Sequence, residues 1–336
     1  MKLLLREAVR VALIAFGAAL LIAPAGSGSG EPQQKDEQRK DPPRVRKSVK
    51  VFGPYDLEAG GLMQVPGGRV PMTFPDRSWV LSYSTEVVDP EGRPLQNDLH
   101  CHTILWTWFT EEWRNRGFDG VPFRGLLSDG YTTGFRVPEG FGIFCDKDEP
   151  LSLLLAFNNR TPGVVRASYR VTVEYVLDSE LTHPLTPLYG TLESVVTPHL
   201  YMVKPGTDVR ERKFSFPYDG TIHAMAVHIH PYGKSIEMIN DSRGETVWKA
   251  VGKKNGSGVL ENMPFYVDAK GYSFRADETY RLRVTYENPT DKEQDAMAGV
   301  IVLFSTKDGK MPRPTTPPPA GGVEDSQDLH THHHGG

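Results

Sequence analysis

Two histidines separated by one residue are the clearest candidates for chemistry in this sequence. They are His228 and His230, in the segment AVHIHPYGK at residues 226–234. Residues two apart on a β-strand point to the same face, so both imidazoles can reach one metal ion. Ala224 and Ala226 lie on that face and leave room for an ion. The opposite face is apolar and is predicted to belong to a core: Met225, Val227 and Ile229.

Two further segments support a metal site. In LHCHTILWTW, His100 and His102 are predicted to share one strand face, with Cys101 on the other. In DAMAGVIVLF, Met297 stands at the start of an apolar strand instead of within it. A thioether beside two imidazoles favours copper, because sulfur is a soft ligand that prefers Cu(I). No ladder of Asp and Asn residues matches a calcium-binding loop.

The elements that carry these residues are predicted to be β-strands. The chain contains 33 Gly and 27 Pro among 336 residues, which is typical of many turns, and no convincing amphipathic helix is longer than two turns. Strand-like segments separated by turns favour an all-β fold of two tandem antiparallel, jelly-roll-like β-sandwich domains. The main strand-like segments are SWVLSYSTEV, LHCHTILWTWF, LSLLLAF, SYRVTVEYV, GTIHAMAVHIH, YRLRVTYEN and AMAGVIVLF.

Composition and the chain ends predict the remaining organisation. Two cysteines are too few for a disulfide scaffold or a four-thiolate zinc site, and a net charge of −4 gives no general attraction to nucleic acid. The predicted parts are a signal peptide at 1–25, a disordered linker at 26–48, a first sandwich at 49–180, a second sandwich at 181–307, and a Pro-rich and His-rich tail at 308–336.

The N-terminal segment has the features of a secretory signal. A basic start precedes the apolar run VALIAFGAALLIA, and Ala23-Pro24-Ala25 offers a cleavage site. The run is too short for a comfortable transmembrane helix. We therefore predict a periplasmic or extracellular protein with no stable membrane association after cleavage. The tail HTHHHGG, either native or a tag remnant, can bind divalent metals loosely.

Together these motifs resemble the copper type II, ascorbate-dependent monooxygenases, the family of peptidylglycine alpha-hydroxylating monooxygenase and dopamine beta-monooxygenase. The resemblance covers most of residues 75–305. It rests on His228-Ile229-His230-Pro231-Tyr232-Gly233-Lys234, on the late Met297, on GFRVPEG at 134–140 and on PLYGTLESV at 187–195. It implies two β-sandwiches that face each other across a solvent-filled cleft, with one copper in each. His228, His230 and Met297 would hold the oxygen-activating copper.

The first copper site departs from the family pattern. The family has two adjacent histidines where this chain has Cys101-His102, so His102 is the retained ligand and His100 a substitute from the same face. Asn158 stands where the third histidine is expected, and an amide is a poor copper ligand. The electron-storing site is therefore either rebuilt, with His100 and Cys101, or lost. The simplest expectation for the two cysteines is a Cys101–Cys145 disulfide. The alternatives are two unpaired thiols, or Cys101 as a thiolate ligand of copper.

These departures leave two functions open. The first is a secreted copper-binding protein with one His2Met site and catalysis undecided. The alternative is an active copper monooxygenase that uses oxygen and a small-molecule reductant. Its substrate would be small and uncharged, because Ala226 and Ile301 replace the residues that hold a peptide carboxylate in the amidating member of the family. A third reading is a structural β-sandwich with incidental histidines.

Overall fold

The structure is a computed structural model, and it describes residues 42–61, 63–107, 119–132, 134–196, 199–256 and 258–314. The predicted signal peptide, most of the linker and the His-rich end of the tail lie outside the described residues. The described chain is almost entirely strand and turn, with short 3-10 turns at Asn97–Leu99 and Asp178–Glu180. None of its helical segments combines the length and apolarity that crossing a membrane would require. The all-β prediction is confirmed.

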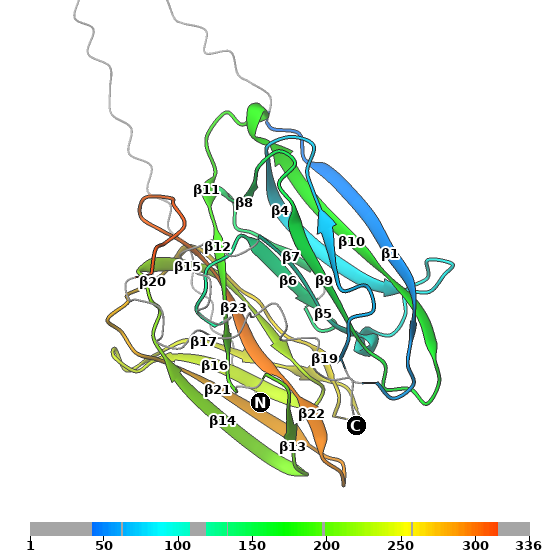
Figure 1. Cartoon of the computed structure of the whole chain (residues 1–336). Coiled ribbons are helices and arrows are strands. Elements are labelled where there is room, and N and C mark those ends of the chain that lie inside the picture. The colour runs from blue at the N-terminus through cyan, green and yellow to red at the C-terminus, as the bar shows by residue number, and fades with distance from the viewer. Residues whose placement is uncertain are drawn as a thin grey trace, which may run out of the picture. The chain divides into compact units, whose positions relative to one another are not determined.

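The first sandwich consists of two sheets (Figure 1). The outer sheet, called here the β1 sheet, has the order β1 (Arg46–Leu57), β10 (Val165–Leu177), β4 (Ser78–Val88), β8 (Phe141–Cys145), β11 (Thr186–Pro187), with β7 (Gly134–Arg136) beside β4. The inner sheet, called the β5 sheet, has the order β2 (Met63–Gln64), β9 (Leu151–Asn158), β5 (His100–Trp106), β6 (Gly125–Asp129), with β3 (Arg69–Met72) beside β9.

The second sandwich also has two main sheets. The β15 sheet has the order β12 (Tyr189–Ser194), β23 (Ala298–Ser305), β15 (Gly220–Ile229), β20 (Tyr266–Phe274). The β21 sheet has the order β14 (Gly206–Phe214), β21 (Tyr280–Asn288), β16 (Gly233–Asn240), β17 (Glu245–Val251). Two small ribbons complete it: β13 (Tyr201–Val203) with β22 (Gln294–Ala296), and β18 (Lys253–Lys254) with β19 (Leu260–Asn262).

The element boundaries differ slightly from the predicted domain boundaries. β1 begins at Arg46, inside the segment expected to be linker. β11 pairs in parallel with β8, so residues up to Pro187 still belong to the first sandwich, and the second begins with β12 at Tyr189. Within the Pro-rich stretch 181–190, predicted as the junction, Thr186–Pro187 adds a short strand to the β1 sheet before β12 begins at Tyr189.

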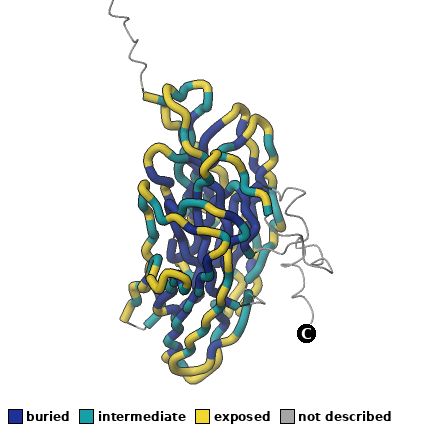
Figure 2. Tube along the Cα trace, turned by 90° about the vertical axis from the view of Figure 1, so that its left-hand side faces the viewer, coloured by how far each residue is buried: buried dark blue, intermediate teal, exposed yellow. Residues whose placement is uncertain are grey.

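The β5 and β15 sheets pack against each other as the two inner layers. Ala224 of β15 and Ile301 and Leu303 of β23 belong to the same apolar cluster as the core of the first sandwich. Met225 and Val227, on the other face of β15, lie in the core of the second sandwich. The β15 sheet is therefore covered on both faces, which explains why β15 and β23 are almost continuously apolar. Figure 2 shows that the buried residues are concentrated in the middle of the fold.

Candidate metal site

The strand β15 and the turn after it position the two predicted histidine ligands. β15 ends at Ile229, where the segment Pro231-Tyr232-Gly233 turns the chain into β16. The His228 and His230 rings lie on the same side, with centroids 5.3 Å apart. His230 continues the strand direction because its N–H donates to the Met297 carbonyl over 3.1 Å. The prediction that both imidazoles project together is confirmed.

Each of these histidines is oriented by a buried carboxylate. His228 Nδ1 lies 3.1 Å from Asp129 Oδ2, and His230 Nδ1 lies 2.6 Å from Asp295 Oδ2. A carboxylate accepts hydrogen bonds, so the Nδ1 atoms donate and the Nε2 lone pairs point the other way. This is the arrangement that fixes the ring and tautomer of metal-binding histidines. Sequence reasoning missed both aspartates: Asp129 gives no local signal, while Asp295 stands only two residues before Met297.

The Met297 thioether meets the free nitrogen of His228. Met297 lies between β22 and β23, and its carbonyl accepts a hydrogen bond from the Tyr286 hydroxyl over 2.6 Å. Its Sδ atom is 3.1 Å from His228 Nε2. With Nδ1 of His228 donating to Asp129, these two facing atoms both carry lone pairs and no proton between them. A cation placed beside both would satisfy them, so the donor set fits a bound metal.

A β-bulge in β5 brings the first sandwich into the same site. The pairing of β5 with β9 shifts between His100 and His102, so Cys101 has no partner of its own on β9. At such a bulge two neighbouring residues can face the same side of a sheet. Cys101 Sγ lies 3.7 Å from His230 Nε2, and the His102 ring centroid lies 4.7 Å from that of His228. Both residues thus face the second sandwich.

The bulge overturns the prediction that His100 and His102 share a face. His100 points between the two sheets of the first sandwich, where its Nε2 is 3.2 Å from Thr85 Oγ1. Its ring makes an edge contact with Tyr169, at 5.0 Å between centroids. Burial lowers the pKa of His100 to about 4, so this histidine is neutral at physiological pH. As a ligand, His100 is on the wrong side of the sheet.

The expected Cys101–Cys145 disulfide is absent, and both cysteines are free and buried. Cys145 is on β8 of the β1 sheet, with its Sγ directed to the Ile143 carbonyl. Cys101 is on the β5 sheet and faces away toward His230. Cys145 belongs to the core of the first sandwich, whereas Cys101 faces the second sandwich, so no bond joins them and Cys101 stays available to the site.

The buried Asp295 carboxylate behind His230 is held in its charged form by its neighbours. Burial acts to raise the pKa of Asp295, but the hydrogen bond from His230 and the Arg160 guanidinium 2.6 Å away lower it to about 2. Burial lowers the pKa of His230, which favours the neutral imidazole that a metal ligand must be, while the hydrogen bond to Asp295 acts in the opposite direction. With its amide oxygen turned toward Arg160, Asn158 accepts from that guanidinium over 3.0 Å. Asn158, the residue at the expected third-histidine position, thus contacts Arg160, which in turn holds the Asp295 carboxylate behind His230.

The atoms that could hold an ion are concentrated in one place. Among the described residues, the only group of three or more His, Cys, Asp or Glu side chains with metal-site spacing is Cys101, His228 and His230, whose ligand atoms lie within 4.8 Å of one another. All three are buried, and Met297 is only 8% exposed. The two sandwiches therefore meet around one cluster, where the family resemblance implies two coppers across a solvent-filled cleft.

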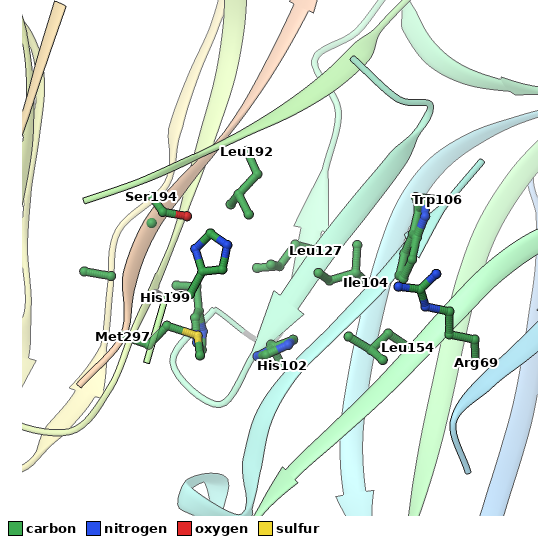
Figure 3. A pocket seen from close by; sticks show the side chains of 13 residues that line it. Arg69, His102, Ile104, Trp106, Leu127, Leu154, Leu192, Ser194, His199 and Met297 are labelled. Carbon is green, nitrogen blue, oxygen red and sulfur yellow. The ribbon is translucent and has the colours of Figure 1, made fainter. Parts of the chain in front are cut away.

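A mostly apolar cavity adjoins this cluster (Figure 3). It measures about 60 Å³ as the space open to the centre of a water molecule. His102, His199 and Met297 lie toward one side in Figure 3, with Trp106 and Arg69 at the other. His199 has a buried Nδ1 with no hydrogen-bond partner in the described part of the chain. The lining is completed by Ile104, Leu127, Leu154, Leu192, Ser194, His228, Ala298 and Gly299.

Comparisons with known proteins add no functional relative. No family model and no curated protein matches the sequence. Among solved structures, the STIV MCP is 11% identical, with 78% of this chain and 96% of that chain covered and a TM-score of 0.32. PNGF-II is 8% identical over 78% of this chain and 66% of that chain, with a TM-score of 0.39. Recombinant peptide:N-glycanase F is 12% identical over 80% and 96%, with a TM-score of 0.28.

Proposed function

We propose that this chain is a copper-binding protein that holds one ion through His228, His230 and Met297. The observation that carries the proposal is the facing pair of His228 Nε2 and Met297 Sδ, 3.1 Å apart, with His228 Nδ1 engaged by Asp129. With His228 Nδ1 donating to Asp129, a cation bound beside both facing atoms would take up their two lone pairs. The periplasmic or extracellular location remains a prediction from the N-terminal segment.

The donor types favour copper over other ions. Imidazole suits several transition metals, whereas a thioether selects a soft ion such as Cu(I). The carboxylates behind both rings, which orient the imidazoles, are the usual support for such a site. Hard cations such as Ca²⁺ require six or more oxygen ligands, and this cluster presents nitrogen and sulfur instead.

The cluster supports binding better than two-copper catalysis. The residues expected to store an electron are distributed differently: His102 and Cys101 join the site of His228 and His230, and His100 lies on the other side of the sheet. A monooxygenase of the resembled type uses a second, separate copper. One cluster at the junction of two sandwiches fits a protein that holds or delivers copper.

The cavity favours one alternative, an active copper monooxygenase with a small, uncharged substrate. Its walls are largely aliphatic, and His228 and Met297 contribute to them. A substrate held there would lie next to the bound copper, and the protein would orient it and exclude water. Oxygen and a small-molecule reductant would be the other reactants.

Copper content measured together with ascorbate-driven oxygen consumption tests the proposal. Because the tail can bind copper, every chain carries His330, His332, His333 and His334 replaced by Gln. We expect one copper per chain, lost in His228→Ala and in Met297→Ile, without oxygen uptake above free copper. Uptake that depends on His228 would favour the monooxygenase. A chain that retains no copper would refute both functions.

A further inference from the structure

Cys101 is a chemically reactive side chain of the cluster that the proposed site does not use. Its Sγ atom is 3.7 Å from His230 Nε2 and 3.3 Å from His102 Nδ1. It comes from the first sandwich, whereas His228, His230 and Met297 come from the second. The bulge in β5 is what turns it toward them.

We infer that Cys101 is a fourth copper ligand, so that the ion is held by one cysteine, two histidines and one methionine drawn from both sandwiches. This inference rests on the proposed function. In a tetrahedral site with bonds of about 2.0–2.3 Å, neighbouring ligand atoms lie about 3.5 Å apart. The distances of 3.7 Å from Cys101 Sγ to His230 Nε2 and 3.1 Å from His228 Nε2 to Met297 Sδ bracket that value.

Burial and the Asp295 and Asp129 carboxylates raise the pKa of the Cys101 thiol, so a thiolate forms there only with a bound cation beside it. Asp129 is fully buried, and His228 is the only basic side chain within ion-pair distance of it among the residues that the structure describes. Asp295, by contrast, is paired with Arg160. Asp129 Oδ1 accepts hydrogen bonds from the Tyr131 and Thr132 N–H groups and from the Thr132 hydroxyl. Its Oδ2 faces His228 Nδ1, so a metal ion at His228 Nε2 would place a positive charge opposite this carboxylate across the ring. The Cys101 proton leaves to solvent when the ion binds, since only the thiolate is a ligand.

The fourth ligand changes the chemistry of the site. Two histidines and a cysteine with a weak methionine are the ligands of blue-copper electron-transfer centres. Such a centre accepts one electron from a small-molecule reductant, as Cu(II) becomes Cu(I), and passes it to a one-electron acceptor. With all four positions filled, no position is left open for oxygen. The inference therefore assigns an electron-carrying role to the cluster and opposes the monooxygenase alternative.

The visible spectrum of the copper-loaded, oxidised wild-type chain tests this directly. Thiolate ligation gives Cu(II) an intense visible charge-transfer absorption that nitrogen and thioether ligands alone do not give. The matched variants are Cys101→Ser and Cys145→Ser, both in the chain whose four tail histidines are replaced by Gln. We expect the absorption in wild type and Cys145→Ser, and its complete loss in Cys101→Ser, which keeps copper with at least tenfold weaker affinity.

The outcomes separate the two levels of the proposal. One tightly bound copper with no charge-transfer absorption in wild type would overturn the role of Cys101 and leave the His2Met site standing. No bound copper, or zinc retained in preference to copper, would refute the proposed function itself. The decisive reading is made on the wild-type chain, so a folding defect in either variant does not affect it.

Discussion

The segments His228-Ile229-His230 and His100-Cys101-His102 have the same spacing, yet the structure treats them differently. In β15 the two histidines project together, with ring centroids 5.3 Å apart. In β5 the pairing with β9 shifts by one residue between the histidines. His102 then faces the second sandwich while His100 faces the interior of the first.

The difference shows that the period-two rule depends on pairing as well as on sequence. A regular strand alternates its faces, and one unpaired residue reverses the alternation for everything that follows. In β5 the reversal places Cys101 at the interface with the second sandwich and leaves His100 in the core of the first. The same spacing therefore gives a pair of candidate ligands, His228 and His230, in β15. In β5 it gives His102 beside the cluster and His100 in the core.

The comparison predicts opposite effects of removing a histidine from each segment. His230→Ala should weaken Cu(I) binding by more than about 100-fold, because it removes a ligand and not only its support. His100→Gln should leave the affinity within about twofold of wild type. Competition with a Cu(I) chelator measures both, with thermal unfolding as a check on folding. Equal losses in the two variants would place His100 in the site after all.

The buried position of His100 predicts acid sensitivity of the metal-free protein. Its pKa is lowered by burial to about 4 from an ordinary value of 6.5. The unfolded chain binds a proton in this range and the folded chain does not, so stability falls as pH decreases from about 6.5 to 4. The loss attributable to His100 is about 3 kcal/mol in the free energy of unfolding. Asp295 also makes stability depend on pH, because its pKa is lower in the folded chain. Most of its contribution to the free energy of unfolding is lost below the ordinary pKa of 3.8.

Urea unfolding at pH 7 and pH 4.5 measures this effect. His100→Gln should show a smaller decrease in unfolding free energy between the two pH values, while His230 continues to contribute. The comparison uses the difference between pH values, so a constant effect of the substitution cancels. The same decrease in both proteins would show that His100 is not the buried neutral group.

The carboxylate behind His230 should affect copper less than the histidine itself. Asp295→Asn keeps a hydrogen-bond acceptor for His230 Nδ1 but removes the negative charge. Loss of such a supporting group weakens metal binding by about 10–100-fold. Asp268→Asn on β20 is the control, because His223 contacts the Asp268 backbone carbonyl and not its carboxylate. If both variants bind equally well, the carboxylate of Asp295 does not support the ion.

The smallest effect is expected at Lys234, the basic residue that ends the His-x-His motif. Its Nζ lies 2.6 Å from Glu287 Oε1, and both side chains are about half exposed. Surface ion pairs of this kind contribute about 1 kcal/mol or less. Lys234→Ala should therefore leave copper affinity unchanged and shift the unfolding free energy only slightly. A large loss of copper would give Lys234 a role that its exposed position does not suggest.

The sequence predicted the second half of the molecule more accurately than the first. The alternation in β15 correctly placed Met225 and Val227 in a core and Ala224 on the other face. In β5, every residue is buried, so polarity gives no sign of which side each faces. The bulge at Cys101 follows from how β5 pairs with β9, and no residue in HCHTIL marks it.

The sequence by itself determined the all-β fold and the shared face of His228 and His230, because turn residues and strand periodicity are local properties. Only the tertiary structure decided which groups surround that pair. Asp129 and Cys101 come from the first sandwich, about 100 residues or more away along the chain. Their approach depends on the packing of the β5 sheet on the β15 sheet and on one bulge, and both arise from long-range contacts.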